Sequence, residues 1–229
     1  MVKAYIVGVG PGSSEYLTEK ARKVISEADI IVGWRLDLLP ADKLIKNKEV
    51  YIQDVDNYIE VVSRAAERAK LTGKSIAVLR IGDPCISSGL NGLLKIFKDF
   101  DVEIIPGISS IQVAASIAKI NLDESVIVSL HDGGNAIRKM EFIANMLNYG
   151  RHVILLTGPE LKLEEAAGAL IANGISKQTP VIVCENLTLR GEYEGLHENV
   201  FVGVLEDLLL RRFSWLSIVV IKCRDHNEY

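Results

Sequence analysis

The sequence has few cysteines, no long apolar run and no excess of positive charge. Its 229 residues include three cysteines, Cys85, Cys184 and Cys223, whose wide spacing fits neither a disulfide framework nor a zinc site. Uninterrupted apolar runs such as 153–156 and 218–221 fall far short of the ~18 residues of a membrane helix. A net charge of −4 argues against a basic nucleic-acid surface. We therefore expect a soluble, cytoplasmic chain without a metal site, nucleic-acid partner or membrane partner.

Strand-like runs alternate with helical patterns along the chain, and this alternation favours an α/β fold. A hydrophobic content of 48% and a charged content of 24% are typical of globular proteins. The expected strands cover residues 3–9, 30–32, 75–79, 102–105, 125–130, 152–156, 180–184, 189–193, 200–204 and 216–222. The expected helices cover residues 17–28, 55–69, 89–99, 109–118, 136–147 and 161–172.

The pattern starts again after residue 121, which predicts two domains. We place the boundary near residues 112–122, giving an N-terminal α/β domain over 1–115 and a C-terminal α/β domain with a mixed sheet over 116–229. The later strands lack long helices between them, so part of the second sheet is expected to be antiparallel. The fifteen basic and fifteen acidic residues of 1–112 cancel, so the whole net charge lies in the remainder. Basic contacts to an anionic substrate are therefore expected in the first half.

The turn over residues 8–12, rich in glycine, resembles a dinucleotide-binding fingerprint but departs from it. Ser13 stands where the fingerprint needs its third glycine, and Pro11 removes a backbone donor. One interpretation is a tight turn that lets a strand and a helix pack closely. The other is the edge of a ligand site, because ligands bind outside the carboxyl ends of strands in open α/β sheets. A nicotinamide-dependent oxidoreductase is kept as a rival hypothesis.

Two further loops follow expected strands at residues 82–84 and 106–110. Gly82 lets another backbone approach closely, and Asp83 either caps the following helix or contacts a ligand. Ser109 and Ser110 of the last loop have the same two interpretations, as helix caps or as ligand contacts.

Taken in order, the segments VGVGPG (7–12), LRIGDP (79–84) and IPGISS (105–110) resemble the tetrapyrrole methylase family. The resemblance covers essentially the whole chain. It implies a class III S-adenosylmethionine (SAM) methyltransferase with two α/β domains and an active-site cleft between them. Within the family, SLH (129–131), LTGP (156–159) and VCENL (183–187) are similar to the branch that methylates carbon 5 of cobalt-precorrin-7 in anaerobic cobalamin biosynthesis. A SAM cofactor, a tetrapyrrole substrate and a homodimer are therefore expected.

The resemblance also implies roles for individual residues. It places SAM contacts at Pro11, Gly82, Asp83, Ile86, Ser110, Ile111, Leu156, Cys184 and Leu216. Arg35 and Arg80 are candidates to bind substrate carboxylates, with ordinary salt bridges as the alternative. His131 is the candidate catalytic residue, able to donate a hydrogen bond or move a proton at the ring, with a structural histidine as the alternative.

Two further rivals stand beside the oxidoreductase. One is a diphthine synthase-type methylase, which acts on elongation factor 2 and shares the same fold. The other is a tetrapyrrole carrier without enzymatic activity, because the sequence contains no compulsory nucleophile.

Overall fold

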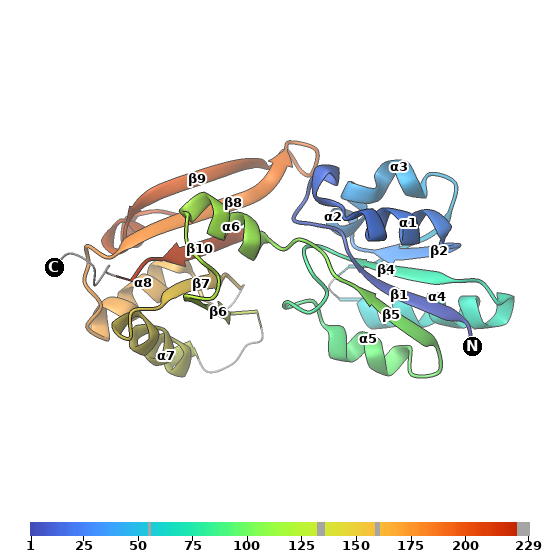
Figure 1. Ribbon diagram of the computed structural model, residues 1–229, viewed down its shortest axis with the longest axis horizontal. Helices are drawn as coiled ribbons and strands as arrows, with labels where there is room; N and C mark the ends of the chain where they lie inside the picture. Colours follow the sequence, from blue (N-terminus) through green and yellow to red (C-terminus); the bar gives the residue numbers. More distant parts are fainter. Residues whose placement is uncertain (55, 132–135, 159–160, 224–229) are drawn as a thin grey trace. The chain divides into compact units, whose positions relative to one another are not determined.

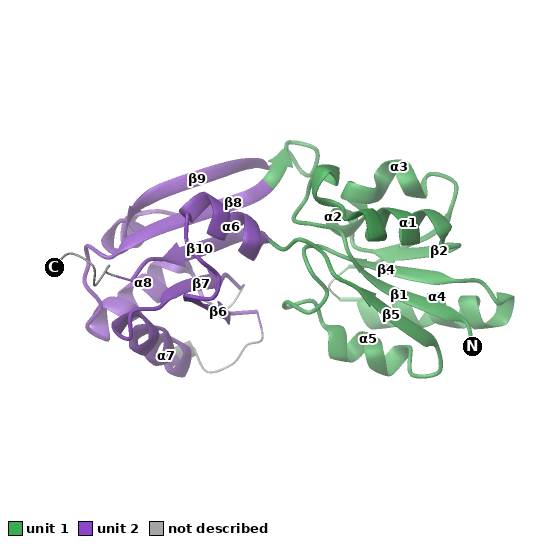
Figure 2. Ribbon diagram, viewed as in Figure 1, with its two compact units in different colours: residues 1–109, 188–195 green, residues 110–187, 196–229 purple. Residues whose placement is uncertain are grey.

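A computed structural model describes residues 1–54, 56–131, 136–158 and 161–223 (Figure 1). The chain forms two compact units (Figure 2). Unit 1 comprises residues 1–109 and 188–195, and unit 2 comprises residues 110–187 and 196–229. The domain boundary expected between residues 115 and 116 stays a prediction, and the description below follows these two units.

Unit 1 is built on a five-stranded sheet in the order β3-β2-β4-β1-β5, in which neighbouring strands run parallel. Its strands are β1 (Lys3–Gly8), β2 (Ile30–Gly33), β3 (Glu49–Ile52), β4 (Ile76–Arg80) and β5 (Asp101–Ile105). Its α-helices are α1 (Glu19–Glu27), α2 (Arg35–Leu38), α3 (Asp42–Ile45), α4 (Tyr58–Thr72) and α5 (Leu90–Ile96). Two short 3-10 turns complete it, η1 (Ser14–Tyr16) and η2 (Leu39–Ala41).

Both faces of the first sheet are covered by helices (Figure 1). Ile30 and Val32 of β2 belong to a core with Val62 of α4, whereas Ile31 between them belongs to a second core with Ile25 of α1. Successive side chains of a strand point to opposite faces, which explains the alternation. Burial on both faces is typical of parallel sheets and places the loops at the strand ends, where a ligand site can form.

Unit 2 contains a mixed sheet in the order β6-β7-β10-β8-β9. Its strands are β6 (Ser125–Ser129), β7 (His152–Leu156), β8 (Pro180–Arg190), β9 (His197–Val204) and β10 (Ser217–Ile221). Its helices are α6 (Ser110–Ala118), α7 (Ala136–Asn148), α8 (Leu163–Ala172) and the 3-10 segment η3 (Leu205–Leu210). β6 and β7 are parallel, whereas β10 runs antiparallel to both β7 and β8. The expected mixed sheet is therefore confirmed.

Most expected elements form, with ends that shift by a few residues. The expectation of separate strands over 180–184 and 189–193 is wrong, because β8 runs without a break over Pro180–Arg190. The polar residues Glu185 and Asn186 interrupt the apolar pattern there without interrupting the strand. The elements α2, α3 and β3 were missed, since four residues are too few to display a period.

No helix among the described residues is long and apolar enough to cross a membrane. The same part of the chain holds no group of three or more histidine, cysteine, aspartate or glutamate side chains arranged to bind a metal ion.

Candidate functional site

The loops that follow β1 and β4 are joined at the carboxyl edge of the first sheet. The two strands are neighbours, and their loops exchange two backbone hydrogen bonds. The Gly10 N–H donates to the Gly82 carbonyl at 3.3 Å, and the Gly82 N–H donates to the Gly10 carbonyl at 2.7 Å. Pro11 directly follows this pair and is buried. Two of the three loops identified in the sequence therefore form one continuous structure.

Glycine is required where the third loop, after β5, approaches the other two. A methyl group added at Gly107 would lie 2.1 Å from the Gly82 carbonyl oxygen, and one added at Gly8 would lie 2.5 Å from the Gly107 nitrogen. Gly82 itself has a φ of +67°, a conformation that favours glycine. Gly8 and Gly107 therefore pack loop against loop, rather than a strand against a helix as one interpretation of the first turn expected, and they do so at the edge where a ligand site was expected.

Asp83 ties the second loop to the third through its carboxylate. Oδ1 accepts the Cys85 backbone N–H at 2.8 Å, and Oδ2 accepts the Gly107 backbone N–H at 3.0 Å. Ile86 follows in the same turn, and its N–H donates to the Asp83 carbonyl at 3.1 Å. Asp83 therefore has a structural role, while each carboxylate oxygen retains a lone pair for a ligand. Contacts from Gly82, Asp83 and Ile86 to the cofactor stay predictions.

A buried carboxylate at this edge escaped the sequence analysis. Asp37 of α2 is 2% exposed, and it accepts the Trp34 backbone N–H at 2.9 Å and the Ile81 backbone N–H at 2.8 Å. It thereby connects the loop after β2 with the loop after β4. Burial raises the pKa of Asp37, and the nearby Arg80 guanidinium opposes that rise. An acidic residue inside the otherwise apolar run 36–41 was the signal that could have found it.

Arg80 and Arg35, the two expected substrate contacts, lie in different surroundings. The Arg80 side chain is 14% exposed, with Nη1 3.9 Å from Asp37 Oδ2 and the guanidinium carbon 5.7 Å from the centroid of the Tyr58 ring. Its Nε is buried without a hydrogen-bond partner in the described part of the chain. Arg35 begins α2 and is exposed. A substrate contact stays a prediction for both, and Arg35 is the more accessible of the two.

The segment 188–195, which comes from late in the chain, also borders this edge of unit 1. Thr188 Oγ1 accepts the Ser13 N–H at 2.8 Å, directly after the first loop and across 175 residues of sequence. Tyr193 packs edge-on against Trp34, with the ring centroids 6.0 Å apart. Residues 189–193 are expected from the sequence to form an ordinary strand. These long-range contacts are not expected, because no local pattern marks them.

The third loop leads directly from unit 1 into α6 of unit 2. Ser110 is the first residue of α6, and Ile111 beside it is 2% exposed. Ser109, which ends unit 1, is equally buried. Cofactor contacts from Ser110 and Ile111 stay predictions.

The three cofactor contacts expected from strand ends of unit 2 lie close together. Leu156 ends β7 and Cys184 lies in β8, and each pairs with Ile218 of β10 between them. Leu216 directly precedes β10. Burial, together with the Glu198 carboxylate, raises the pKa of the Cys184 thiol to about 11, so this side chain is an inert core group. Cofactor contacts from Leu156, Cys184 and Leu216 stay predictions.

His131 lies beyond the end of β6, beside the end of β7. It is exposed, its backbone N–H donates to Ser129 Oγ at 3.2 Å, and its ring Nδ1 lies 3.5 Å from the same oxygen. Gly158 packs so closely against this turn that an added methyl group would lie 2.3 Å from the Leu130 carbonyl oxygen. The turn is therefore held in place with an accessible imidazole, and its catalytic role stays a prediction. Pro159 of the LTGP segment lies outside the described residues.

The groups at the carboxyl edge of unit 1 fit SAM. The backbone at Gly10 and Gly82 permits close approach, and Asp83 supplies a negative charge to balance a sulfonium or ammonium cation. A mostly neutral surface with a few fixed polar groups suits a nucleoside. Pro11, Gly82, Asp83 and Ile86 are the residues of this unit that would hold the cofactor, and these contacts stay predictions.

A parallel sheet with glycine loops packed at its carboxyl edge, followed by a unit with a mixed sheet, is the architecture expected of an α/β methyltransferase that uses SAM, and comparison with known families shows that class. Residues 3–208 match the model of the family described as Tetrapyrrole (Corrin/Porphyrin) Methylases, and the chain belongs to this family.

The chain is similar along most of its length to curated relatives. It is 38% identical over 219 residues to the probable cobalt-precorrin-7 C(5)-methyltransferase of Methanocaldococcus jannaschii, which covers 94% of this chain and 96% of that protein. It is 29% identical over 218 residues to the cobalt-precorrin-4 C(11)-methyltransferase of the same organism. This match covers 86% of this chain and 82% of that protein.

The fold is also that of a solved methyltransferase. The crystal structure of uroporphyrin-III C-methyl transferase from Thermus thermophilus complexed with S-adenyl homocysteine matches with a TM-score of 0.72 and 20% identity, covering 96% of this chain and 92% of that one. The expected family, fold class and cofactor are thus confirmed.

Proposed function

We propose that this chain transfers a methyl group from SAM to carbon 5 of cobalt-precorrin-7, a step of anaerobic cobalamin biosynthesis. The observation that carries the proposal is the 38% identity to the probable C(5) enzyme, over 94% of this chain and 96% of that protein. Identity to the C(11) enzyme is lower, at 29%, and covers less of both chains. The SLH and VCENL segments support the same assignment.

SAM, when bound, supplies a methyl group that its positive sulfur has already activated. Pro11, Gly82, Asp83 and Ile86 would hold SAM, which would supply this methyl group for displacement by the ring carbon. The main task of the chain is to align the reacting atoms at about 3 to 3.5 Å. The Gly10–Gly82 hydrogen bonds and the bonds of the Asp83 carboxylate to the third loop hold the loops that perform this alignment. The same carboxylate stabilises the positive charge of the methyl donor.

The substrate would be a large polycarboxylate, for which the exposed Arg35 guanidinium offers a bidentate contact. Arg80 contributes a second positive charge from a more buried position. The exposed His131 ring is the group that would hold or accept a proton at the macrocycle. The homodimer implied by the family resemblance stays a prediction.

The test is to incubate the purified chain with SAM carrying a ¹³C-labelled methyl group and with cobalt-precorrin-7. Mass spectrometry should show one added methyl group, and NMR should place the label on carbon 5. Parallel reactions with cobalt-precorrin-4 and with unmodified elongation factor 2 test the two nearest methylase activities. Methylation in either of those reactions and none of cobalt-precorrin-7 would contradict the proposal. Titration with NADH, followed by fluorescence, tests the oxidoreductase hypothesis.

A further inference from the structure

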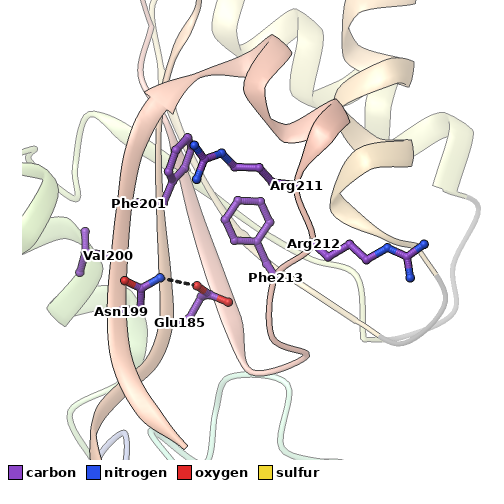
Figure 3. A pocket seen from close by; sticks show the side chains of 7 residues that line it. All are labelled: Glu185, Asn199, Val200, Phe201, Arg211, Arg212 and Phe213. Atoms are coloured by element: carbon purple, nitrogen blue, oxygen red, sulfur yellow. Dashed lines mark hydrogen bonds between the residues drawn. The ribbon is translucent and has the colours of Figure 1, made fainter.

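A pocket of about 360 Å³ opens in unit 2, and its lining includes no residue assigned above (Figure 3). It is formed by two neighbouring strands, β8 and β9, and by the segment that joins η3 to β10. Its lining residues are Glu185, Asn199, Val200, Phe201, Arg211, Arg212 and Phe213. This volume is within the usual range of small-molecule sites.

Glu185 builds the wall of this pocket with its carboxylate. Oε2 accepts the Asn199 side-chain amide at 2.7 Å, and Oε1 accepts the Ser214 backbone N–H at 2.6 Å. The first of these bonds is drawn in Figure 3. Both oxygens are thus engaged in holding β8, β9 and the 211–214 segment together. The two donors fix the position of this carboxylate in the wall.

The pocket carries two arginines that balance no acidic side chain. The Arg211 guanidinium carbon lies 4.4 Å from the centroid of the Phe201 ring, a cation–π contact that fixes the charge above the pocket. Arg212 is exposed. Neither arginine forms an ion pair within the described ranges of the chain. Two such charges are unexpected in the half of the sequence that holds the whole net charge of −4.

The acidic residues nearest in sequence are already engaged elsewhere. Glu206 of η3 accepts a hydrogen bond from the Gln178 side-chain amide, and Asp207 accepts the Val204 backbone N–H at 2.9 Å. The arginines are therefore available to pair with an anionic ligand.

The aromatic side chains add a second requirement. Phe201 and Phe213 lie with ring centroids 5.7 Å apart and planes inclined at 52°. Figure 3 shows both rings at the pocket, with the Arg211 guanidinium beside Phe201. Rings beside guanidinium groups favour a ligand with a flat apolar body and a carboxylate, because guanidinium pairs with carboxylate and the ring faces bury apolar surface.

We propose that this pocket binds a carboxylate-bearing edge of the tetrapyrrole substrate, through Arg211 and Arg212 and against Phe201 and Phe213. The inference rests on the proposed function for the identity of the ligand. Successive residues of a strand face opposite sides of a sheet, so Glu185 lines this pocket from the face opposite to Cys184. Substrate affinity and SAM affinity should therefore respond separately to changes in the pocket.

The first test uses a fluorescent porphyrin that carries eight carboxylates as the probe, titrated into the full-length chain at fixed ionic strength. The double substitution Arg211→Gln with Arg212→Gln should weaken porphyrin binding at least tenfold, because it removes both guanidinium groups that would pair with the porphyrin carboxylates. SAM affinity, measured by calorimetry, should stay within about twofold. Arg212→Gln alone, which changes an exposed side chain, provides a second variant if the double one fails to fold.

Arg64→Gln is the matched control. Arg64 is an exposed arginine on α4 whose guanidinium carbon lies 5.7 Å from the centroid of the Tyr51 ring, so its substitution removes one positive charge from a comparable contact and matches the single Arg212→Gln variant in charge. Porphyrin binding should be unchanged in this control. Equal affinity in the double variant and the wild type, or equal weakening in the control, would overturn the proposal.

The two proposals can fail separately. If the wild type binds the porphyrin through Arg211 and Arg212 but does not methylate cobalt-precorrin-7, the pocket stands and the proposed reaction falls. If cobalt-precorrin-7 is methylated by the double variant with an unchanged Michaelis constant, the reaction stands and the pocket falls.

Discussion

At the carboxyl edge of the first sheet the loops are locked by buried contacts, whereas exposed side-chain contacts connect the amino ends of the same strands. Asp37, 2% exposed, bridges the segments after β2 and β4. At the opposite ends of these two strands, the exposed Asp29 accepts the Ser75 backbone N–H at 2.9 Å and the Ser75 hydroxyl at 2.8 Å. The same residue type thus performs the same connection in two environments.

Glycines repeat the contrast. Gly107 at the carboxyl edge has no space for a side chain, because an added methyl group would lie 2.1 Å from a carbonyl oxygen. Gly73, which follows α4 before β4, has a φ of +68° and nothing within 4 Å of an added methyl group. Only the backbone conformation constrains Gly73, whereas packing constrains Gly107. The comparison shows that intolerance to change is concentrated at the edge where the cofactor contacts are expected.

The largest difference in unfolding free energy and in SAM binding is expected between the variants Gly107→Ala and Gly73→Asn. The first forces backbone against backbone and should cost about 3 kcal/mol or more of unfolding free energy, together with most SAM binding. The second places a residue that tolerates the left-handed conformation and should cost about 1 kcal/mol without affecting SAM. Urea unfolding and calorimetry measure both quantities. Equal losses in the two variants would show that the close approach in the structure is easily relaxed.

The next largest difference is expected between the variants Asp37→Asn and Asp29→Asn. The side-chain amide introduced by Asp37→Asn offers a single acceptor oxygen to the two backbone N–H groups and leaves Arg80 without its counterion. We therefore expect a loss of about 2 kcal/mol and at least tenfold weaker SAM binding. Asp29→Asn should cost less than about 1 kcal/mol, because water reaches its partners. Urea unfolding and calorimetry again measure the two effects. The result that would break the comparison is normal SAM affinity in a folded Asp37→Asn protein.

Sequence reasoning was effective where the determining signal is local. Strand and helix periods, and the glycine and proline residues of the loops after β1, β4 and β5, lie within a few residues of the features that they specify. The notable exception is β8, where polar residues at 185 and 186 obscured a continuous strand that neighbouring strands hold together.

The missed parts of the site depend on contacts between distant segments. Asp37 acts through the backbone N–H of Ile81, and a backbone donor leaves no mark in a side-chain pattern. Thr188 meets Ser13 across 175 residues. The burial of Arg80 is likewise set by Asp37 and Tyr58, so its sequence position beside the second loop made it look more accessible than it is.

The pH dependence of stability should differ in sign between the two aspartates. Burial raises the folded-state pKa of Asp37 above 3.8, so its ionised form costs stability above that pKa, and the cost disappears as pH falls through it towards 3.8. The hydrogen bonds from the Ser75 hydroxyl and backbone lower the pKa of Asp29, so its stabilisation is present above 3.8 and is lost as pH falls through the lower, folded-state pKa.

Unfolding free energies of the wild type and the two asparagine variants, measured from about pH 3 to pH 7, test these signs. As the pH falls, the unfolding free energy of the wild type should exceed that of Asp29→Asn by a smaller amount. Its excess over that of Asp37→Asn should become larger. Each unit of pKa shift corresponds to at most about 1.4 kcal/mol of unfolding free energy. Parallel curves for the two variants would contradict the difference in environment.

The smallest effects are expected from exposed ion pairs, at whichever edge they lie. Arg190 and Glu15 are 3.2 Å apart beside the first loop, with side chains 72% and 65% exposed. Lys3 and Asp101 are 3.8 Å apart at the amino ends of β1 and β5, with exposures of 57% and 56%. Glu15→Gln and Asp101→Asn should each cost less than about 0.5 kcal/mol, and salt should reduce the loss. If Glu15→Gln weakened SAM binding and Asp101→Asn did not, any contact at the carboxyl edge would be sensitive to substitution, whether buried or exposed. An equal, small loss of unfolding free energy in both variants would instead show that only the buried contacts at that edge are sensitive.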